Sequence, residues 1–266
     1  MNDLTLRDRL NNMVQTVEET LDTTELAVTN NFAALTNNAL DIIRSNLKKQ
    51  PLSFQLFDIV KSPSGGSTVF SVPGLSGDEA EKELTGIILD YSTPRAYWKT
   101  ADPVEGTPPD CFSEDSMISH EGKACAQCPF NDYGSKDGDS NAKACKESVV
   151  LYLLRPNNIM PIVVRVPVTS KLRFQRYLTR LVGRMKPLSS VVTKITLEKT
   201  TNRTGQPYSL FNFEVVKELE PEEAASAAKF AEQFATLLDT TTSPDTTRNT
   251  STTNTTEINT PNKKAV

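Results

Sequence analysis

Residues 191–219 read VVTKITLEKTTNRTGQPYSLFNFEVVKEL. Two runs rich in β-branched and aromatic residues flank the polar turn Asn202–Pro207, and this arrangement predicts a β-hairpin. Further runs of the same kind lie upstream, at Ser53–Val60, Ser67–Val72, Leu84–Tyr91, Val149–Leu154 and Ile162–Val166. We expect a second hairpin loop at Ser62–Gly66. So many strands predict an antiparallel sheet, most simply closed into an OB-like barrel.

The sequence predicts a mainly β fold with flanking helices, which is an α+β class. The chain divides into four regions. Residues 1–50 carry apolar side chains at three- and four-residue steps and predict an N-terminal helical segment. Residues 51–220 form the predicted OB-like β-domain, with a loop insertion at 101–148. Residues 221–239 predict an alanine-rich C-terminal helix. The Thr/Asn-rich tail, 240–266, has too little apolar surface to fold, so we expect disorder there.

All four cysteines lie in the insertion, at Cys111, Cys125, Cys128 and Cys145. A Cys-x-x-Cys turn with two flanking cysteines is typical of a structural Zn²⁺ site, which we favour. A metal would also supply the order that a long loop without strand or helix pattern lacks. An iron–sulfur cluster and a pair of disulfides remain as alternatives. The only histidine, His120, could replace one cysteine, but we interpret it as an exposed loop residue.

The net charge of −4 conceals a strong asymmetry. Residues 161–203 hold ten basic side chains and one acidic side chain, Glu198. Within them, Ser170–Met185 predicts a helix with Ser170 as N-cap and a one-sided arginine stripe. Charge segregated in this way can steer a polyanion onto one face of a protein.

Aromatic residues alternate with cations in two places, at 95–99 and at 173–177. Aromatic rings stack on bases and cations neutralise phosphates, so the pattern predicts binding of single-stranded nucleic acid. The predicted contact residues are Arg95, Tyr97, Trp98, Lys99, Arg173, Arg176, Arg180, Arg184, Lys186 and Lys194. The competing interpretation is a solvated helix face with rings that pack in the core.

Signatures of an enzyme are weak, and we expect no catalytic residues. Three carboxylates near Cys111, those of Asp110, Glu114 and Asp115, suggest a metal-dependent nuclease as an alternative, but a solvated acidic loop is favoured. No apolar stretch approaches the ~20 residues needed to span a bilayer. The charged residues 1–10 do not resemble a secretory signal, so we expect a cytoplasmic protein without membrane contact.

The strings Pro94–Trp98, Pro108–Ser113, Cys125–Asn131 and Lys143–Lys146 resemble a family encoded by bacteriophages and integrative elements. The likeness extends over roughly residues 50–215 and carries a Cys-x13-Cys-x2-Cys-x16-Cys motif. It implies a mobile-element setting, supports the four cysteines as the ligand set and leaves His120 outside it. The overall plan is also similar to that of the helix-destabilising protein of T-even phages, which joins a zinc subdomain to an OB-fold.

These observations predict a zinc-containing protein that binds single-stranded DNA, or RNA, in replication or recombination in a bacterial host cell. The alternative is a zinc-stabilised adaptor that recruits a replication or host protein through the helices of residues 1–49.

Overall fold

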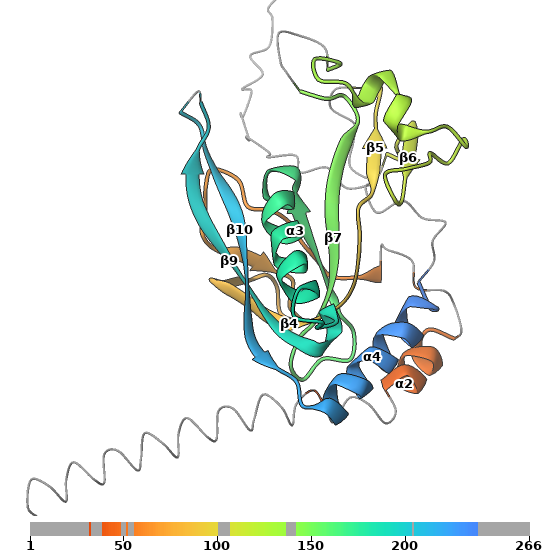
Figure 1. Cartoon of the computed structure of the whole chain (residues 1–266), viewed down its shortest axis with the longest axis vertical. Helices are drawn as coiled ribbons and strands as arrows, with labels where there is room; N and C mark the ends of the chain where they lie inside the picture. The colour runs from red at the N-terminus through yellow and green to blue at the C-terminus, as the bar shows by residue number, and fades with distance from the viewer. Residues whose placement is uncertain are drawn as a thin grey trace, which may run out of the picture.

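The computed structural model describes residue 32 and residues 39–48, 52, 56–100, 107–136, 142–203 and 205–238. Within these residues, eight strands form one sheet, whose main path runs β1-β8-β7-β4-β9-β10 (Figure 1). The strands of this path are β1 (Ile59–Val60), β8 (Ile162–Pro167), β7 (Lys146–Leu154), β4 (Glu83–Ser92), β9 (Val191–Thr201) and β10 (Pro207–Glu218). Short strands β5 (Arg95–Tyr97) and β6 (Cys111–Ser113) extend it, because β5 pairs with both β6 and β7. Each of the seven predicted runs contains an observed strand.

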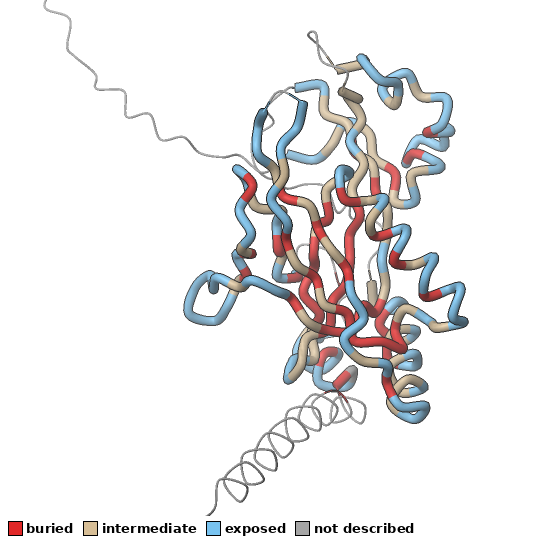
Figure 2. The backbone as a smooth tube through the Cα atoms, turned by 60° about the vertical axis from the view of Figure 1, so that its left-hand side comes forward, coloured by how far each residue is buried: buried red, intermediate tan, exposed pale blue. Residues whose placement is uncertain are grey.

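The central strands are buried on both faces, because helices cover the sheet from two sides. Every residue of β7 from Val149 to Leu154 is buried. Odd-numbered residues of this run join one hydrophobic cluster and even-numbered residues join a second cluster across the sheet. Figure 2 shows the burial concentrated in the central strands. A strand covered on both faces needs no polar alternation, which explains its continuous apolar sequence.

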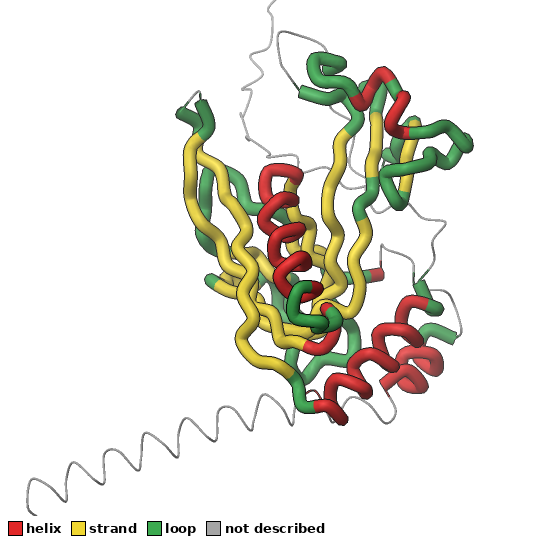
Figure 3. Tube along the Cα trace, viewed as in Figure 1, coloured by secondary structure: helices red, strands yellow, loops and turns green. Residues whose placement is uncertain are grey.

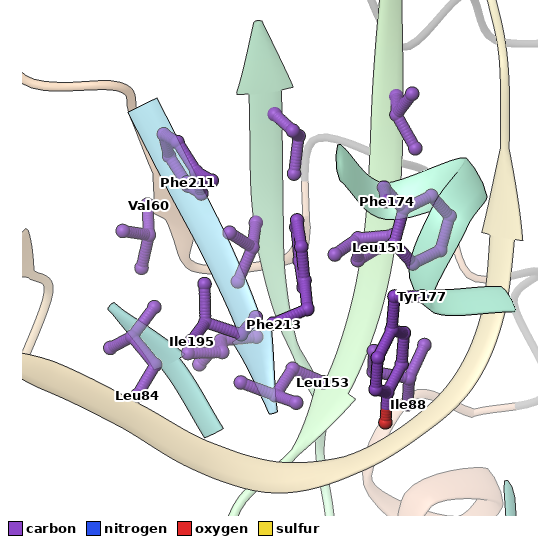
Figure 4. Close-up of a cluster of buried hydrophobic side chains, with 14 of the residues drawn as sticks. Val60, Leu84, Ile88, Leu151, Leu153, Phe174, Tyr177, Ile195, Phe211 and Phe213 are labelled. Carbon is purple, nitrogen blue, oxygen red and sulfur yellow. The ribbon is translucent and has the colours of Figure 1, made fainter. Parts of the chain in front are cut away.

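Helix α3 (Val168–Val182) packs against the concave face of the curled sheet. Figure 4 shows Phe174 and Tyr177 of this helix among the strand residues of the first cluster. The ring of Phe174 lies 5.2 Å from that of Phe213. The hydroxyl of Tyr177 lies 2.7 Å from that of Thr193, so its one polar atom is paired inside the core.

The prediction that Ser170 is the N-cap of α3 is wrong, since Pro167 holds that position. Ser170 lies inside the helix, where its hydroxyl accepts a hydrogen bond of 3.0 Å from the backbone N–H of Phe211 in β10. The helix therefore covers part of the outer edge of β10, where a further strand would have to pair to close a barrel. The sheet stays open between β1 and β10 across the described ranges. The mainly β, α+β class is confirmed, whereas OB-like closure is not.

Helices α2 (Ala39–Asn46) and α4 (Pro221–Ala235) cover the opposite face (Figure 3). A capping box between Glu220 and Glu223 begins α4. The ring of Phe234 then packs edge-on against Tyr152 of β7, at 5.6 Å between centroids. The predicted helices before residue 32 and the predicted tail lie outside the described residues.

The two predicted hairpin turns have opposite outcomes. The turn Asn202–Pro207 is confirmed, because it joins the antiparallel strands β9 and β10. The hairpin at Ser62–Gly66 is wrong: β1 pairs in parallel with β8, and β2 (Phe70–Val72) pairs with β3 (Glu79–Glu81). Gly65 and Gly66 do turn the chain, with positive φ values of 65° and 72°. Turn residues specify a local change of direction but not the strand that the chain meets next.

The packing of β4 against β7 generates a test of the fold. A Cβ atom added to Gly86 of β4 would overlap the carbonyl oxygen of Leu154 and lie 3.0 Å from its carbonyl carbon. We expect Gly86→Ala to lower the free energy of unfolding by about 2 kcal/mol, because both contacts are backbone and cannot move aside. Urea denaturation measures this change.

Gly183→Ala is the matched control, because Gly183 has φ −61° and no neighbouring atom closer than 3.4 Å. We expect that variant to be as stable as the parent, or more stable by up to about 1 kcal/mol. Equal stability of Gly86→Ala and the parent would contradict the observed contact of β4 with β7.

Candidate functional site

The cysteine module comprises β5, β6 and the described residues between 107 and 146. Its four cysteines come from three places: Cys111 begins β6, Cys125 and Cys128 begin and end the 3-10 turn η2 (Cys125–Gln127), and Cys145 precedes β7. The backbone N–H of Cys128 donates to the carbonyl of Cys125 at 3.3 Å. The N–H of Cys145 donates to the carbonyl of Phe130 at 2.8 Å. These bonds bring residues that are far apart in sequence into one small module.

The surroundings of Cys145 and Cys111 disfavour the charged thiolate form. Burial raises the pKa of Cys145 to about 11; Arg95 opposes this shift, and the other three thiols add to it. Burial also raises the pKa of Cys111, together with Glu121, Cys128 and Cys125. All four cysteines are free thiols. The donor set is that of a structural zinc site.

The arrangement of the thiols is looser than a metal site requires. Within the described ranges, no three His, Cys, Asp or Glu side chains are placed so that they could hold a metal ion. Zinc binding would therefore require the four thiols to move closer together than they stand. His120 has another role, because its Nδ1 accepts a hydrogen bond of 3.3 Å from the backbone N–H of Phe112. Its ring also stacks on the ring of Phe112 at 4.6 Å.

A network of three charges joins the cysteine module to the sheet and to α3. Arg95 of β5 donates to Oε2 of Glu147 in β7 at 2.7 Å, and the two side chains are only 11% and 13% exposed. Lys171, in the first turns of α3, donates to the other oxygen of the same carboxylate. Arg95 also donates to Oδ1 of Asn131, whose Nδ2 donates to the carbonyl of Cys125 at 3.0 Å. One carboxylate thus connects a helix, a strand and the turn that holds two cysteines.

Sequence reasoning missed Glu147. An acidic residue at the start of a strand that is otherwise apolar was the available signal. That signal could not reveal which cations surround it.

Five of the ten predicted nucleic-acid contacts are cations that the structure pairs with acidic side chains. The pairs are Arg95 with Glu147, Lys99 with Asp110, Arg173 with Glu198, Lys186 with Glu218 and Lys194 with Glu214. The hydrogen bond from Arg173 is the main cause that lowers the pKa of Glu198. A paired cation has less charge to offer a phosphate than a free one.

The two predicted stacking rings already have partners. Tyr97 stacks on Phe130, with 4.0 Å between ring centroids and 12° between ring planes. The indole N–H of Trp98 donates to the carbonyl of Thr107 at 3.0 Å. Both side chains are half-buried, and their partners lie within the cysteine module, so they help to hold the module together.

The remaining predicted contacts form what we call the arginine row: Arg176, Arg180 and Arg184. All three side chains are exposed, and none has an acidic partner among the residues that the structure describes. Arg176 and Arg180 lie one turn apart on α3, about 6 Å along the axis. Arg184 follows in the turn that ends the helix, where its N–H donates to the carbonyl of Leu181 at 3.0 Å.

Two of the three acidic residues that suggested a metal-dependent nuclease, Asp110 and Asp115, form hydrogen bonds that stabilise the local backbone. Asp110 accepts a hydrogen bond of 2.8 Å from the backbone N–H of Lys99. Asp115 accepts one of 2.7 Å from the backbone N–H of Met117, and this bond is the main cause that lowers the pKa of Asp115. These two carboxylates therefore stabilise turns on either side of β6.

The charge network predicts that Glu147→Gln destabilises the protein. The neutral amide would leave Arg95 and Lys171 without their shared counter-charge at a site that is nearly buried. We expect the free energy of unfolding to fall by about 3 kcal/mol, as when one partner of a buried ion pair is removed. Denaturant titration of the purified chain measures the loss.

Glu214→Gln serves as the control, because Glu214 is 61% exposed in its pair with Lys194. Its loss should cost less than about 1 kcal/mol. If both variants lost the same small amount, Glu147 would be an ordinary surface partner rather than the connection between the module and α3.

Comparisons with protein-family models, with curated proteins and with solved structures found no match to this chain. Among the described residues, no helix combines the length and apolarity required to cross a bilayer. Three features of the molecule bear on its function: the four thiols, the charge network and the arginine row.

Proposed function

We propose that this protein binds single-stranded DNA along the outer surface of α3, without catalysing a reaction on it. The observation that carries the proposal is the arginine row, because Arg176, Arg180 and Arg184 are exposed and lack acidic partners in the described part of the chain. The other cations named from the sequence are mostly neutralised by their neighbours. We therefore assign phosphate contact to these three residues first.

The chemistry of the arginine row suits a nucleic-acid backbone. A guanidinium stays charged at any physiological pH and can donate two parallel hydrogen bonds to a phosphate. Each phosphate that it neutralises releases a condensed counterion, which supplies free energy without reading the base sequence. A general single-strand binder needs this kind of affinity.

Exposed apolar side chains on α3 and in the turn that ends it favour a single strand over a duplex. Leu172, Val182 and Met185 are 56%, 73% and 91% exposed. Unstacked bases of a single strand can contact such side chains, whereas a duplex hides its bases inside. In this proposal the curled sheet replaces the predicted OB-like barrel as scaffold, and α3 carries the strand.

We further propose that one Zn²⁺ ion stabilises the cysteine module, held by Cys111, Cys125, Cys128 and Cys145. The support is the set of four free thiols and the backbone hydrogen bonds of Cys128 and Cys145, which join their turns in one module. Zinc would supply structural order, because four thiolates close its coordination shell and leave no open position for a substrate. A role in replication or recombination of a mobile element follows from the sequence resemblance and belongs to the same proposal.

The DNA-binding proposal predicts that the affinity for single-stranded DNA falls steeply with salt concentration, and that the arginine row causes most of this dependence. For single strands, each phosphate contact contributes about 0.7 to the slope of log affinity against log salt concentration. We expect the triple variant Arg176→Ala, Arg180→Ala, Arg184→Ala to lose about two units of slope. Anisotropy of a labelled oligonucleotide in a salt series measures this slope.

Lys229→Ala is the matched control, because Lys229 is an exposed cation on α4, across the sheet from α3. It should leave the slope unchanged. A wild-type protein that fails to bind at micromolar concentration would overturn the proposal. So would a triple variant that keeps the parent slope.

The zinc proposal predicts about one zinc ion per chain by elemental analysis. Cys125→Ser and Cys128→Ser should each lower the zinc content, and a chelator should lower the melting temperature, because the module loses its cross-link. His120→Ala is the control and should retain the metal. A brown protein that absorbs visible light would instead indicate an iron–sulfur cluster.

A further inference from the structure

Two aromatic side chains of the cysteine module are exposed, although most rings in the described part of the chain are buried. Phe130 is 40% exposed and Tyr133 is 79% exposed. Phe130 lies in the 3-10 turn η3 (Pro129–Asn131), and Tyr133 follows two residues after this turn. Neither was among the residues that the sequence pattern selected. Two exposed rings three residues apart on a small module indicate a contact surface.

The ring of Phe130 is held in place by a stack with Tyr97 and by the turn that carries it. Tyr97 stacks against it at 4.0 Å and 12°, which is a parallel arrangement. The turn that carries it is fixed by the N–H of Asn131, which donates to the carbonyl of Cys128 at 2.9 Å. On its C-terminal side, the carbonyl of Phe130 accepts from the N–H of Cys145. The ring is therefore positioned before any ligand arrives, and part of it remains open to solvent.

The ring of Tyr133 carries a cation on one face. Nζ of Lys143 lies 4.6 Å from the ring centroid. The same Nζ donates to Oδ1 of Asn131 at 3.0 Å, which holds the cation in position. A ring contacted by a cation and otherwise exposed combines a flat apolar surface with a local positive charge. Nucleobases joined by phosphates are complementary to both features.

We propose that Phe130 and Tyr133 form a stacking platform for the bases of single-stranded DNA. This inference rests on the proposed function, since the same strand would place its phosphates on the arginine row. The base would extend the existing stack of Tyr97 and Phe130, with Tyr133 and Lys143 beside it. Stacking of this kind accepts every base, so the platform adds affinity without sequence preference.

The arginine row runs toward the end of α3 that lies near the cysteine module. Residues four apart on a helix form a row that slants across its surface. From Arg184 through Arg180 and Arg176, the row continues to Leu172 in the first turns of α3, the end of the helix that also carries Lys171 on another flank. Lys171 is bonded to Glu147, which also holds Arg95 of the cysteine module. A strand that follows the row toward the first turn of α3 therefore approaches the module, which Figure 1 shows beside the start of β7.

The test compares two oligonucleotides of equal length, oligothymidine and a fully abasic strand, which has the phosphates without the bases. The variants are Phe130→Ala, Tyr133→Ala and the double variant, all in the full chain. We expect each single variant to bind oligothymidine roughly tenfold more weakly, as loss of one stacked base predicts. Their affinity for the abasic strand and their salt slope should match those of the parent.

Met117→Ala is the matched control, because Met117 is an exposed apolar residue of the same module, 69% accessible, without a flat ring. It should leave both affinities unchanged. Tyr133→Trp keeps a flat ring and should retain binding to oligothymidine. Because Tyr133 is exposed, its variants test the platform even if Phe130→Ala disturbs the stack with Tyr97.

The outcomes separate the platform from the proposed function. Equal binding of the parent to both oligonucleotides would overturn the platform and leave phosphate contact by the arginine row intact. If the variants bind oligothymidine as tightly as the parent does, the stacking platform is also overturned. The two exposed rings would then be a surface for a protein partner. Equal loss on both strands would overturn it as well, since the rings would then act on phosphates or on the fold. A parent that binds neither strand would refute the proposed function itself.

Discussion

The carboxylate of Glu147 accepts hydrogen bonds from Arg95 on one oxygen and from Lys171 on the other, at a site that is almost closed to water. This shared anion joins three parts of the chain: β5, β7 and the first turns of α3. Charges that are removed from water must be paired, because an isolated buried charge costs several kcal/mol. Together with the pairing of β5 with β7, this one acidic residue places the cysteine module beside α3.

The same principle decides which cations remain available for a ligand. In sequence, residues 161–203 contain almost no acids, so their positive charge looks unopposed. In the folded chain, β10 lies antiparallel to β9 and brings Glu214 opposite Lys194. Glu218 likewise reaches Lys186 at 2.7 Å. Within the described ranges, the arginine row on α3 escapes this neutralisation, as do the exposed cations Lys199 of β9 and Arg203 of the turn that follows it.

The fold likewise decides which aromatic rings are buried and which are exposed, whatever their neighbours in the sequence. Phe174 occurs between cations in the sequence but points into the core, where its ring packs against Phe213. Tyr97 is half-buried because Phe130 covers it. Phe130 and Tyr133 occur in a polar loop and remain exposed. A ring next to charged residues in sequence can point either way, since the side chains of a helix or strand alternate between core and solvent.

Local patterns by themselves determined where the strands lie, where β9 turns into β10 and which four thiols gather in one insertion. Each of these depends on residue preferences within a few positions, which the sequence states directly. Tertiary structure alone decided that β1 joins β8 in parallel, that α3 keeps the sheet open and that Glu147 is shared by two cations. It also decided which arginines and rings face solvent. These features depend on contacts between residues that are distant in sequence, and no local pattern carries the identity of such a partner.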